Sequence, residues 1–333
     1  MGDRIEWIDI AKGIGIILVI LGHTFEISRI SAIYVFHMPL FFFLSGLVFR
    51  NTDKRFHIYV KTQSEKILKP WLKLYLISLV ITITIPQWLG GAGLCEFVKD
   101  IYTSETSTVH NSSLWYLVCF FFVTIIFYGI NMIRRTNLMM MYYWLVAIAL
   151  LIILPKMPIR MPFKIDTAMI AVVFFSMAVW YKDSILKIME KRVPFIIIAI
   201  FVITTLLLCD NSGWCNISSL SFGNYFIIYY LLAFMGIYAI CLTSRWISNS
   251  GMITIRMLLS YYGKNSLIVF GFQGLLIRLY LLLFNINDGL EMTYCGNNPI
   301  RHQIGSFFVI TFIMSPLVVE GFTKLRGLGY KIL

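Results

Sequence analysis

Two side chains with acid–base chemistry lie in one strongly apolar segment near the start of the chain. Lys12 and His23 are eleven positions apart, so on a helix they share one stripe and lie about 16 Å apart along the axis. An imidazole, with an ordinary pKa of about 6.5, can take a proton from an attacking hydroxyl. A cation on the same face can anchor an anionic donor. The pair therefore predicts group transfer across a membrane, along one face of a helix.

Two carboxylates, Asp9 and Glu26, fall on the same stripe, which is roughly 100° wide. Structural alternatives remain open for both. Asp9 and Lys12 can form an i, i+3 ion pair at the membrane interface, and Glu26 can belong to the following loop. For His23 we favour a functional role, because a histidine in lipid needs hydrogen-bond partners that the neighbouring Leu and Ile side chains cannot supply.

The elements that must position these residues are membrane helices. Of 333 residues, 59% are hydrophobic and only 13% charged, whereas soluble domains have roughly 25% charged residues. This composition excludes a soluble enzyme, a disordered chain, a disulfide-rich secreted module and a nucleic-acid-binding domain. Apolar stretches of about 20 residues, the length that crosses a bilayer, can be placed at 10–26, 32–49, 70–88, 114–133, 139–155, 165–181, 194–209, 221–242, 264–284 and 304–322. We expect an all-α polytopic membrane protein, one domain over residues 1–333 with about ten transmembrane helices.

The distribution of basic residues predicts the orientation. With a cytoplasmic N-terminus, 19 of the 28 Lys and Arg residues fall in inner loops and tails and six in outer loops, while Lys12, Lys73 and Arg278 fall within spans. This follows the positive-inside rule, so both termini are expected in the cytoplasm and the net charge of +12 needs no nucleic-acid partner. The first apolar stretch lacks a cleavage pattern and is expected to be a retained span.

Small residues and cysteines have structural interpretations. Gly13, Gly15 and Gly46 are expected to let helices approach closely. The six cysteines show no metal-ligand spacing, so no metal site is expected. Cys209 and Cys215 flank a short outer loop and can form a disulfide or remain free, with two free thiols favoured.

Several segments together resemble one family. Lys12-x10-His23 and the opening Arg4 to Gly13 are similar to the membrane acyltransferase-3 family, and Phe36-His37-Met38-Pro39 to Gly46 resembles its fucose 4-O-acetylase branch. Further similar segments are Lys66-Ile67-Leu68-Lys69, Leu114-Trp115-Tyr116-Leu117, Pro162 to Asp166 and Gly263 to Leu267. The resemblance spans nearly the whole chain.

The resemblance implies transfer of an acyl group, usually acetyl, from cytoplasmic acetyl-CoA to a hydroxyl of a glycan or lipid-linked sugar in the bacterial inner membrane. His23 is then the catalytic residue, as general base or as transient acyl carrier, and Lys12, Lys66 and Lys69 bind the donor. The family has arginines at the positions of Lys66 and Lys69, so the planar fork that suits phosphate is lost here. A histidine expected after the ninth-span motif is Gln273, so a histidine there is not essential in this chain.

Four residues are candidates for binding the acceptor, each with an alternative. His37 can orient the acceptor or share proton transfer, or it can bond a backbone carbonyl. Asn111 and Trp115 can bond and stack on a sugar, although an aromatic anchor at the membrane interface is an equal alternative. Asp166 can bind an acceptor hydroxyl or pair with a loop cation.

The sequence also bears on other membrane and acyl-transfer functions. The His-x4-Asp pattern of soluble glycerolipid acyltransferases is absent, and so is a Gly-x-Ser-x-Gly elbow. A glycan or lipid transporter or flippase is the alternative, but internal repeats, which such proteins often carry, are not found. A non-catalytic scaffold or sensor would not need Lys12 and His23 on one face. Membrane lipids, the acyl-CoA, the sugar acceptor and a possible second copy of the chain are the expected partners.

Overall fold

The structure is a computed structural model that describes residues 5–25, 27–85, 93–133, 137–223, 228–284, 286 and 299–327. Nearly all of these residues are helical, which confirms the all-α class. The α-helices are α1 (Glu6–Thr24), α2 (Ile27–Tyr34), α3 (His37–Leu47), α4 (Phe56–Gln63), α5 (Lys69–Thr84), α7 (Leu94–Thr103), α8 (Trp115–Ile133), α9 (Asn137–Ile153), α10 (Ile165–Trp180), α11 (Lys182–Glu190), α12 (Phe195–Asn211), α13 (Tyr229–Asn249), α14 (Ile253–Lys264), α15 (Ser266–Leu283), α16 (Ile300–Val309) and α17 (Ser315–Gly327).

Short elements join these helices. Two antiparallel strands, β1 (Cys215–Asn216) and β2 (Ser221–Phe222), pair with Cys215 opposite Phe222. The 3₁₀ turns are η2 (Ser112–Leu114), η3 (Leu154–Lys156), η4 (Pro162–Lys164) and η5 (Ile217–Ser219), and the π-helical turns are η1 (Ser64–Leu68) and η7 (Ile310–Met314). Each π turn is followed by a proline, Pro70 or Pro316, whose ring would clash with the carbonyl four residues earlier in a regular helix.

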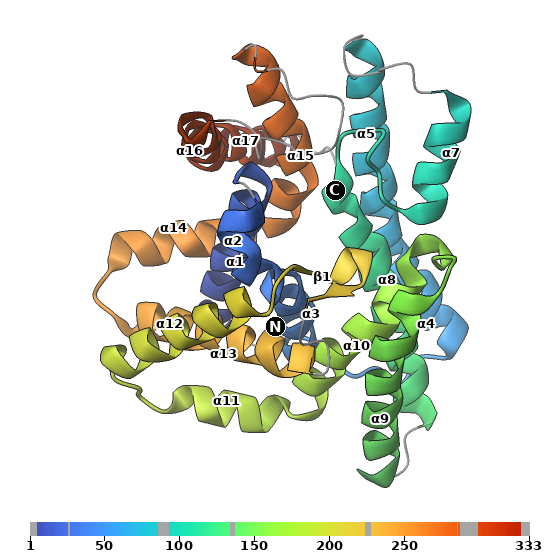
Figure 1. Ribbon diagram of the computed structural model, residues 1–333, viewed down its shortest axis with the longest axis vertical. Helices are drawn as coiled ribbons and strands as arrows, with labels where there is room; N and C mark the ends of the chain where they lie inside the picture. The colour runs from blue at the N-terminus through green and yellow to red at the C-terminus, as the bar shows by residue number, and fades with distance from the viewer. Residues whose placement is uncertain are drawn as a thin grey trace.

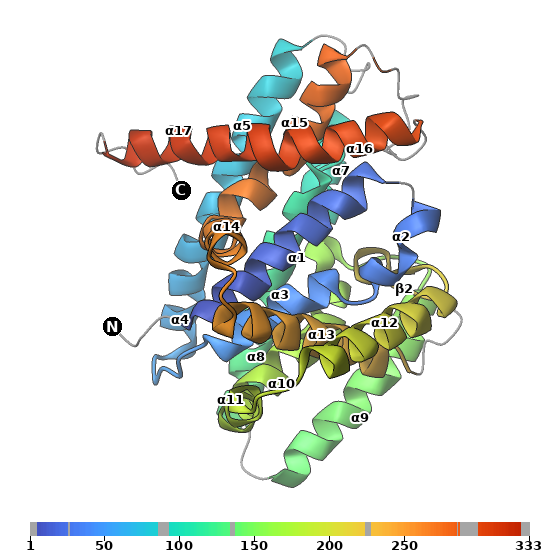
Figure 2. The ribbon, with the colours of Figure 1, turned by 90° about the vertical axis from the view of Figure 1, so that its left-hand side faces the viewer.

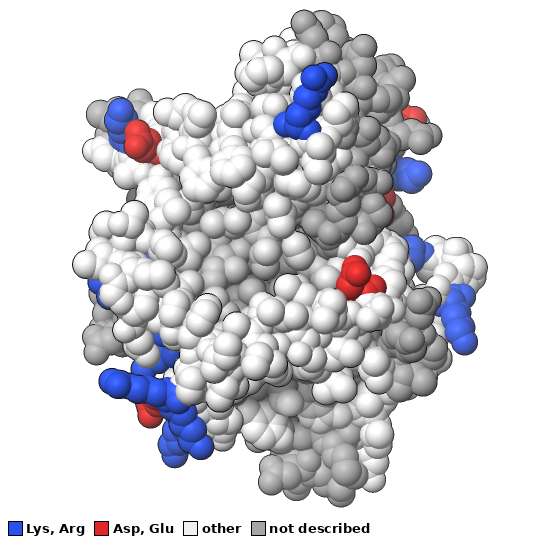
Figure 3. Space-filling view, turned by 60° about the vertical axis from the view of Figure 1, so that its left-hand side comes forward, with Lys and Arg blue, Asp and Glu red and all other residues white. Residues whose placement is uncertain are grey.

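Seven helical segments among the described residues are long and apolar enough to cross a membrane. Shorter apolar helices, Ser31–Leu47, Tyr142–Lys156 and Phe195–Asn211, coincide with three further predicted spans. On the face shown in Figure 3, Lys and Arg lie mainly toward the rim, and the described residues across the broad middle are almost all uncharged. The chain is a multi-pass membrane protein, while the count of ten spans and the cytoplasmic termini stay predictions.

Helix α1 lies at the centre of the molecule (Figure 1). It packs against α14, its most extensive partner, and also against α13, α3 and α15. Helices α12 and α13 lie together on one side, and the continuous α16–α17 segment crosses α15 on another (Figure 2). Segments from both ends of the chain therefore enclose the helix that carries Lys12 and His23.

Glycines set the contact between α1 and α14. A Cβ atom at Gly13 would lie 2.0 Å from the carbonyl oxygen of Leu259, and one at Gly263 would lie 1.8 Å from that of Asp9. A Cβ atom at Gly15 would lie 2.9 Å from the ring of Phe41, and one at Gly46 would lie 2.4 Å from the carbonyl oxygen of Phe175 on α10. The prediction that Gly13, Gly15 and Gly46 serve close helix packing is confirmed.

We expect Gly263→Ala to lower the stability of the protein, because the added methyl group must push the backbones of α1 and α14 apart. Overpacking of this kind costs about 1–3 kcal/mol. The measurement is the thermal unfolding temperature of the purified protein in detergent. Gly129→Ala on α8 is the matched control, since a Cβ there meets nothing within 4 Å. An unfolding temperature equal to that of the control would contradict the prediction.

Candidate active site

The structure places Lys12 and His23 on one sector of α1. At 100° per residue their directions differ by about 20°. Gly15 points to α3 and Gly13 to α14, and the Lys12–His23 sector lies between these two directions. Both side chains are partly buried, and each interacts with other groups of the protein. Asp9, on the same stripe, is 5% exposed, while Glu26 lies outside the described residues.

His37 begins α3, and its Nδ1 lies 2.9 Å from the carbonyl oxygen of Ile33. A carbonyl oxygen only accepts hydrogen bonds, so Nδ1 of the neutral ring carries the proton and Nε2 keeps its lone pair. His37 thus bonds a backbone carbonyl through Nδ1, which was one of its predicted roles. This bond leaves the lone pair on Nε2 able to accept a proton.

Tyr34 links His37 to the end of α1. Its ring meets the His37 ring edge-on with centroids 4.9 Å apart, and its hydroxyl donates a 2.6 Å hydrogen bond to the carbonyl oxygen of Gly22. Gly22 directly precedes His23, and the His23 and His37 imidazoles lie within electrostatic range of each other. The structure therefore brings two of the predicted site residues to the same end of α1.

Lys66 and Lys69 lie on the continuous helical segment Phe56–Thr84. Lys66 lies inside the π turn η1, and the backbone N–H of Lys69 donates to the carbonyl oxygen of Ser64, five residues earlier. Both lysines are exposed, whereas Lys12 is partly buried. Of the three predicted donor-binding residues, Lys66 and Lys69 are therefore at the surface, and Lys12 is partly buried among the helices.

Asn111 is completely buried and bonded on all sides. Its amide nitrogen donates to the hydroxyl of Ser78 at 2.9 Å and to the carbonyl oxygen of Gly271 at 2.7 Å. Its amide oxygen accepts from the hydroxyl of Ser113 at 3.1 Å. Asn111 therefore joins α5, η2 and α15, and neither amide proton remains for a sugar in this arrangement. Trp115 follows at the start of α8 and is partly exposed.

The loop that carries Asn111 is held by Asp100 at the end of α7. The carboxylate accepts a 2.7 Å hydrogen bond from the backbone N–H of Thr108 and a 3.1 Å bond from the hydroxyl of Ser107. Burial raises the pKa of Asp100 above its ordinary value, and the bonds from Thr108 and Ser107 oppose that rise only in part. These hydrogen bonds hold the loop that precedes α8 in a defined conformation.

Asp166, in the first turn of α10, pairs with Arg160. The Arg160 Nε lies 2.5 Å from the Asp166 carboxylate, with the two side chains 38% and 3% exposed. The same carboxylate accepts from the backbone N–H groups of Thr167 at 2.7 Å and Met161 at 3.3 Å. Asp166 thus holds a loop cation, which was one of its two predicted roles, and contact with an acceptor stays a prediction.

Gln273 is a polar residue whose role the sequence did not reveal. It lies in the middle of α15 and is completely buried, and its amide oxygen and nitrogen have no hydrogen-bond partner among the described residues. Its neighbour Gly274 lies against the backbone of His110 and Asn111. A buried amide without protein partners can hold a bound water or ligand, so Gln273 is a further candidate for a functional role. Its place in the sequence, one residue before Gly274, does not by itself indicate that the amide is buried without partners.

The cysteines and acidic residues form no metal cluster in the described parts of the chain. Cys209 and Cys215 are buried free thiols, as the favoured alternative predicted. The Cys215 sulfur lies 3.6 Å from the hydroxyl of Ser212.

Comparison with known proteins identifies the family of the chain. The sequence profile of the acyltransferase domain matches residues 5–319. The chain belongs to the acyltransferase-3 family. A stretch of 141 residues is also 28% identical to the nodulation protein NolL of Sinorhizobium fredii (strain NBRC 101917 / NGR234), covering 38% of this chain and 37% of that protein. No solved structure matches the chain. The matched range begins at Ile5, directly before α1, and covers the stretch of chain in which the predicted site residues lie.

Proposed function

We propose that this membrane protein is an O-acyltransferase of the bacterial inner membrane, related to the fucose 4-O-acetylase branch of its family. It moves an acetyl group from cytoplasmic acetyl-CoA to a hydroxyl of a cell-surface or lipid-linked glycan. Family membership over residues 5–319 supports acyl transfer. The observation that carries the proposal is the single sector of the central helix α1 that holds both Lys12 and His23.

In the proposed reaction, His23 is the general base. It takes the proton from the acceptor hydroxyl as the oxygen attacks the thioester carbonyl carbon, the new C–O bond forms, and the C–S bond breaks. The proton then passes from the imidazolium to the departing thiolate, which releases CoA as the thiol. In the alternative route, His23 itself attacks the thioester, carries the acyl group, and passes it to the hydroxyl in a second step.

The donor and the acceptor are assigned to opposite ends of α1. Lys66 and Lys69, being exposed, can meet the phosphates of the donor first, and Lys12 draws the chain that carries the thioester toward the bundle. At the His23 end, the lone pair on Nε2 of His37, whose Nδ1 is bonded to the carbonyl oxygen of Ile33, can accept a hydrogen bond from the acceptor hydroxyl. Trp115 offers a ring on which a sugar can stack. Asn111 and Asp166 support this end through the contacts that hold α5, α15 and the Arg160 loop.

A donor assay tests the proposal. The purified protein in lipid is mixed with radiolabelled acetyl-CoA, and the release of CoA is followed together with label on the protein and on a crude surface-glycan extract. Label on the glycan establishes the acyltransferase. Failure of acetyl-CoA and of longer acyl-CoAs alike to release CoA would overturn the proposal and favour a glycan or lipid transporter.

We expect the double variant Lys66→Ala, Lys69→Ala to raise the apparent KM for acetyl-CoA about tenfold with little change in kcat, because two charge contacts to phosphate, together worth roughly 1.4 kcal/mol at exposed positions, are lost. Steady-state kinetics at varied donor concentration measures this. Lys61→Ala is the matched control, an exposed lysine on α4. A KM for acetyl-CoA as low as that of the control would contradict donor binding. Lys66 and Lys69 would then serve only to set the orientation of the protein in the membrane.

A further inference from the structure

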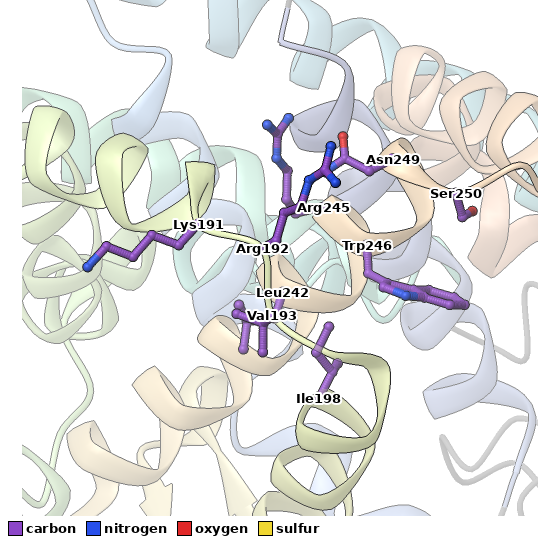
Figure 4. A pocket seen from close by; sticks show the side chains of 9 residues that line it. All are labelled: Lys191, Arg192, Val193, Ile198, Leu242, Arg245, Trp246, Asn249 and Ser250. Atoms are coloured by element: carbon purple, nitrogen blue, oxygen red, sulfur yellow. The ribbon is translucent and has the colours of Figure 1, made fainter.

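A basic pocket lies away from the Lys12–His23 sector. The loop between α11 and α12 and the last turns of α13 enclose a volume of about 260 Å³. Three of its lining residues are cationic, Lys191, Arg192 and Arg245, and two are polar, Asn249 and Ser250. Figure 4 shows the guanidinium ends of Arg192 and Arg245 pointing the same way, toward Asn249, while Lys191 extends away from them.

The described part of the chain provides no counter-ion to the cations of this pocket. No carboxylate lines it, and within the described residues none of its three cations forms a salt bridge. The Nε atom of Arg245 is buried and has no hydrogen-bond partner among those residues. Two guanidinium groups that converge on one cavity without an acid repel each other, and an anion between them removes that cost.

Apolar surface adjoins the pocket. Ile198 and Leu242 contribute to its wall, and α12, which begins beside it, exposes Phe195, Ile196 and Ile200 by 55%, 65% and 58%. Trp246, also in the lining, lies against Phe195 with ring centroids 4.5 Å apart. A cationic pocket beside an apolar, exposed helix and an aromatic pair is the arrangement that suits a phospholipid at the membrane interface.

The pocket lies on the other side of α1 from the candidate active site. Ile10, Ile14 and Ile17 of α1 pack near Trp246 and Ile247 of α13. Lys12 points about 200° around the helix from Ile10. A ligand in this pocket therefore contacts a surface of the bundle that the proposed reaction does not use.

We propose that this pocket binds a phosphate-bearing ligand, and that the ligand is an anionic phospholipid whose headgroup sits between Arg192 and Arg245. Guanidinium groups bind phosphate oxygens through paired hydrogen bonds, and the acyl chains extend along the exposed face of α12. A soluble phosphate compound has the same headgroup chemistry but gains nothing from the apolar flank. The bound lipid ties the α11–α12 loop to α13.

Lipid titration of the full chain tests this. The purified protein in detergent is titrated with dioleoylphosphatidylglycerol or dioleoylphosphatidylcholine, and bound lipid is counted by native mass spectrometry alongside the unfolding temperature. We expect phosphatidylglycerol to bind and stabilise, and Arg192→Gln and Arg245→Gln each to weaken its binding about tenfold. Lys187→Gln, an exposed cation of α11 outside the pocket, serves as the matched control and is expected to bind normally.

The outcomes separate the possible sources of phosphate. Because Arg192 is exposed, its variant is expected to fold even where Arg245→Gln does not. Unchanged phosphatidylglycerol binding in Arg192→Gln would overturn the site. Inorganic phosphate or CoA at millimolar concentration, added without lipid, tests the soluble source: protection equal to that of phosphatidylglycerol, lost in Arg192→Gln, would overturn the lipid assignment.

Discussion

We expect His23→Ala to lower the proposed acyl transfer to glycan by about 10²–10⁴-fold if the imidazole acts as general base, and to abolish it if His23 carries the acyl group. The loss is expected in kcat, because the imidazole acts on the acceptor oxygen or the thioester carbon and not on the phosphates of the donor. Glycan labelling from radiolabelled acetyl-CoA, by protein in lipid, measures it. Incubation of the native protein with donor alone separates the two routes, since only the carrier route leaves label on the protein.

The matched control is His57→Ala. His57 lies on α4 and is exposed, so its loss removes an imidazole without touching the α1 sector. We expect this variant to transfer at the native rate, and both variants to keep the native unfolding temperature within a few degrees. Retained turnover in His23→Ala, with normal folding, would overturn the assignment of His23.

Asp166→Ala is expected to lower the stability of the protein by about 2–3 kcal/mol. The substitution leaves the N–H groups of Thr167 and Met161 without their acceptor and Arg160 without its counter-ion. The unfolding temperature in detergent measures the effect. Because Arg160 is 38% exposed, water can solvate its charge in the variant, and the loss is smaller than for a fully buried pair.

A double-mutant cycle identifies what Asp166 contributes. If the carboxylate mainly holds Arg160, Arg160→Gln combined with Asp166→Asn costs less than the sum of the single variants. If it binds the acceptor, Asp166→Asn raises the KM for the glycan while Arg160→Gln does not. Strictly additive losses of stability would contradict the ion-pair role.

The helical class and the shared sector of Lys12 and His23 could be predicted from local sequence. The apolar stretches require helices in lipid, and the spacing of Lys12 and His23 places both on one sector of any helix. The glycine contacts also followed from residue type, because only glycine tolerates backbones as close as those at Gly13 and Gly46. The family match over residues 5–319 confirms the resemblance to the acyltransferase-3 family, while the fucose 4-O-acetylase branch stays a prediction.

Helix boundaries were less predictable. The predicted span 32–49 is divided between α2 and α3 at Val35 and Phe36, because the ring of Pro39 opposes a helical carbonyl at Val35. The predicted span 10–26 begins earlier, at Glu6. Hydropathy averages over many residues, so it places spans well and their ends poorly.

The partners of polar side chains could not be predicted, because they come from distant parts of the chain. Asn111 bonds Ser78 and Gly271, and no spacing rule connects these three residues. The Gln273 amide has no partner among the described residues, and the pocket at Arg192 and Arg245 joins the α11–α12 loop to helix α13, more than fifty residues away. Hydropathy was sufficient to predict helical, lipid-spanning segments, and helical periodicity was sufficient to predict the polar stripe of α1. Both are properties of a single helix. Tertiary packing was required to learn which polar atoms are satisfied, because that depends on which helices become neighbours.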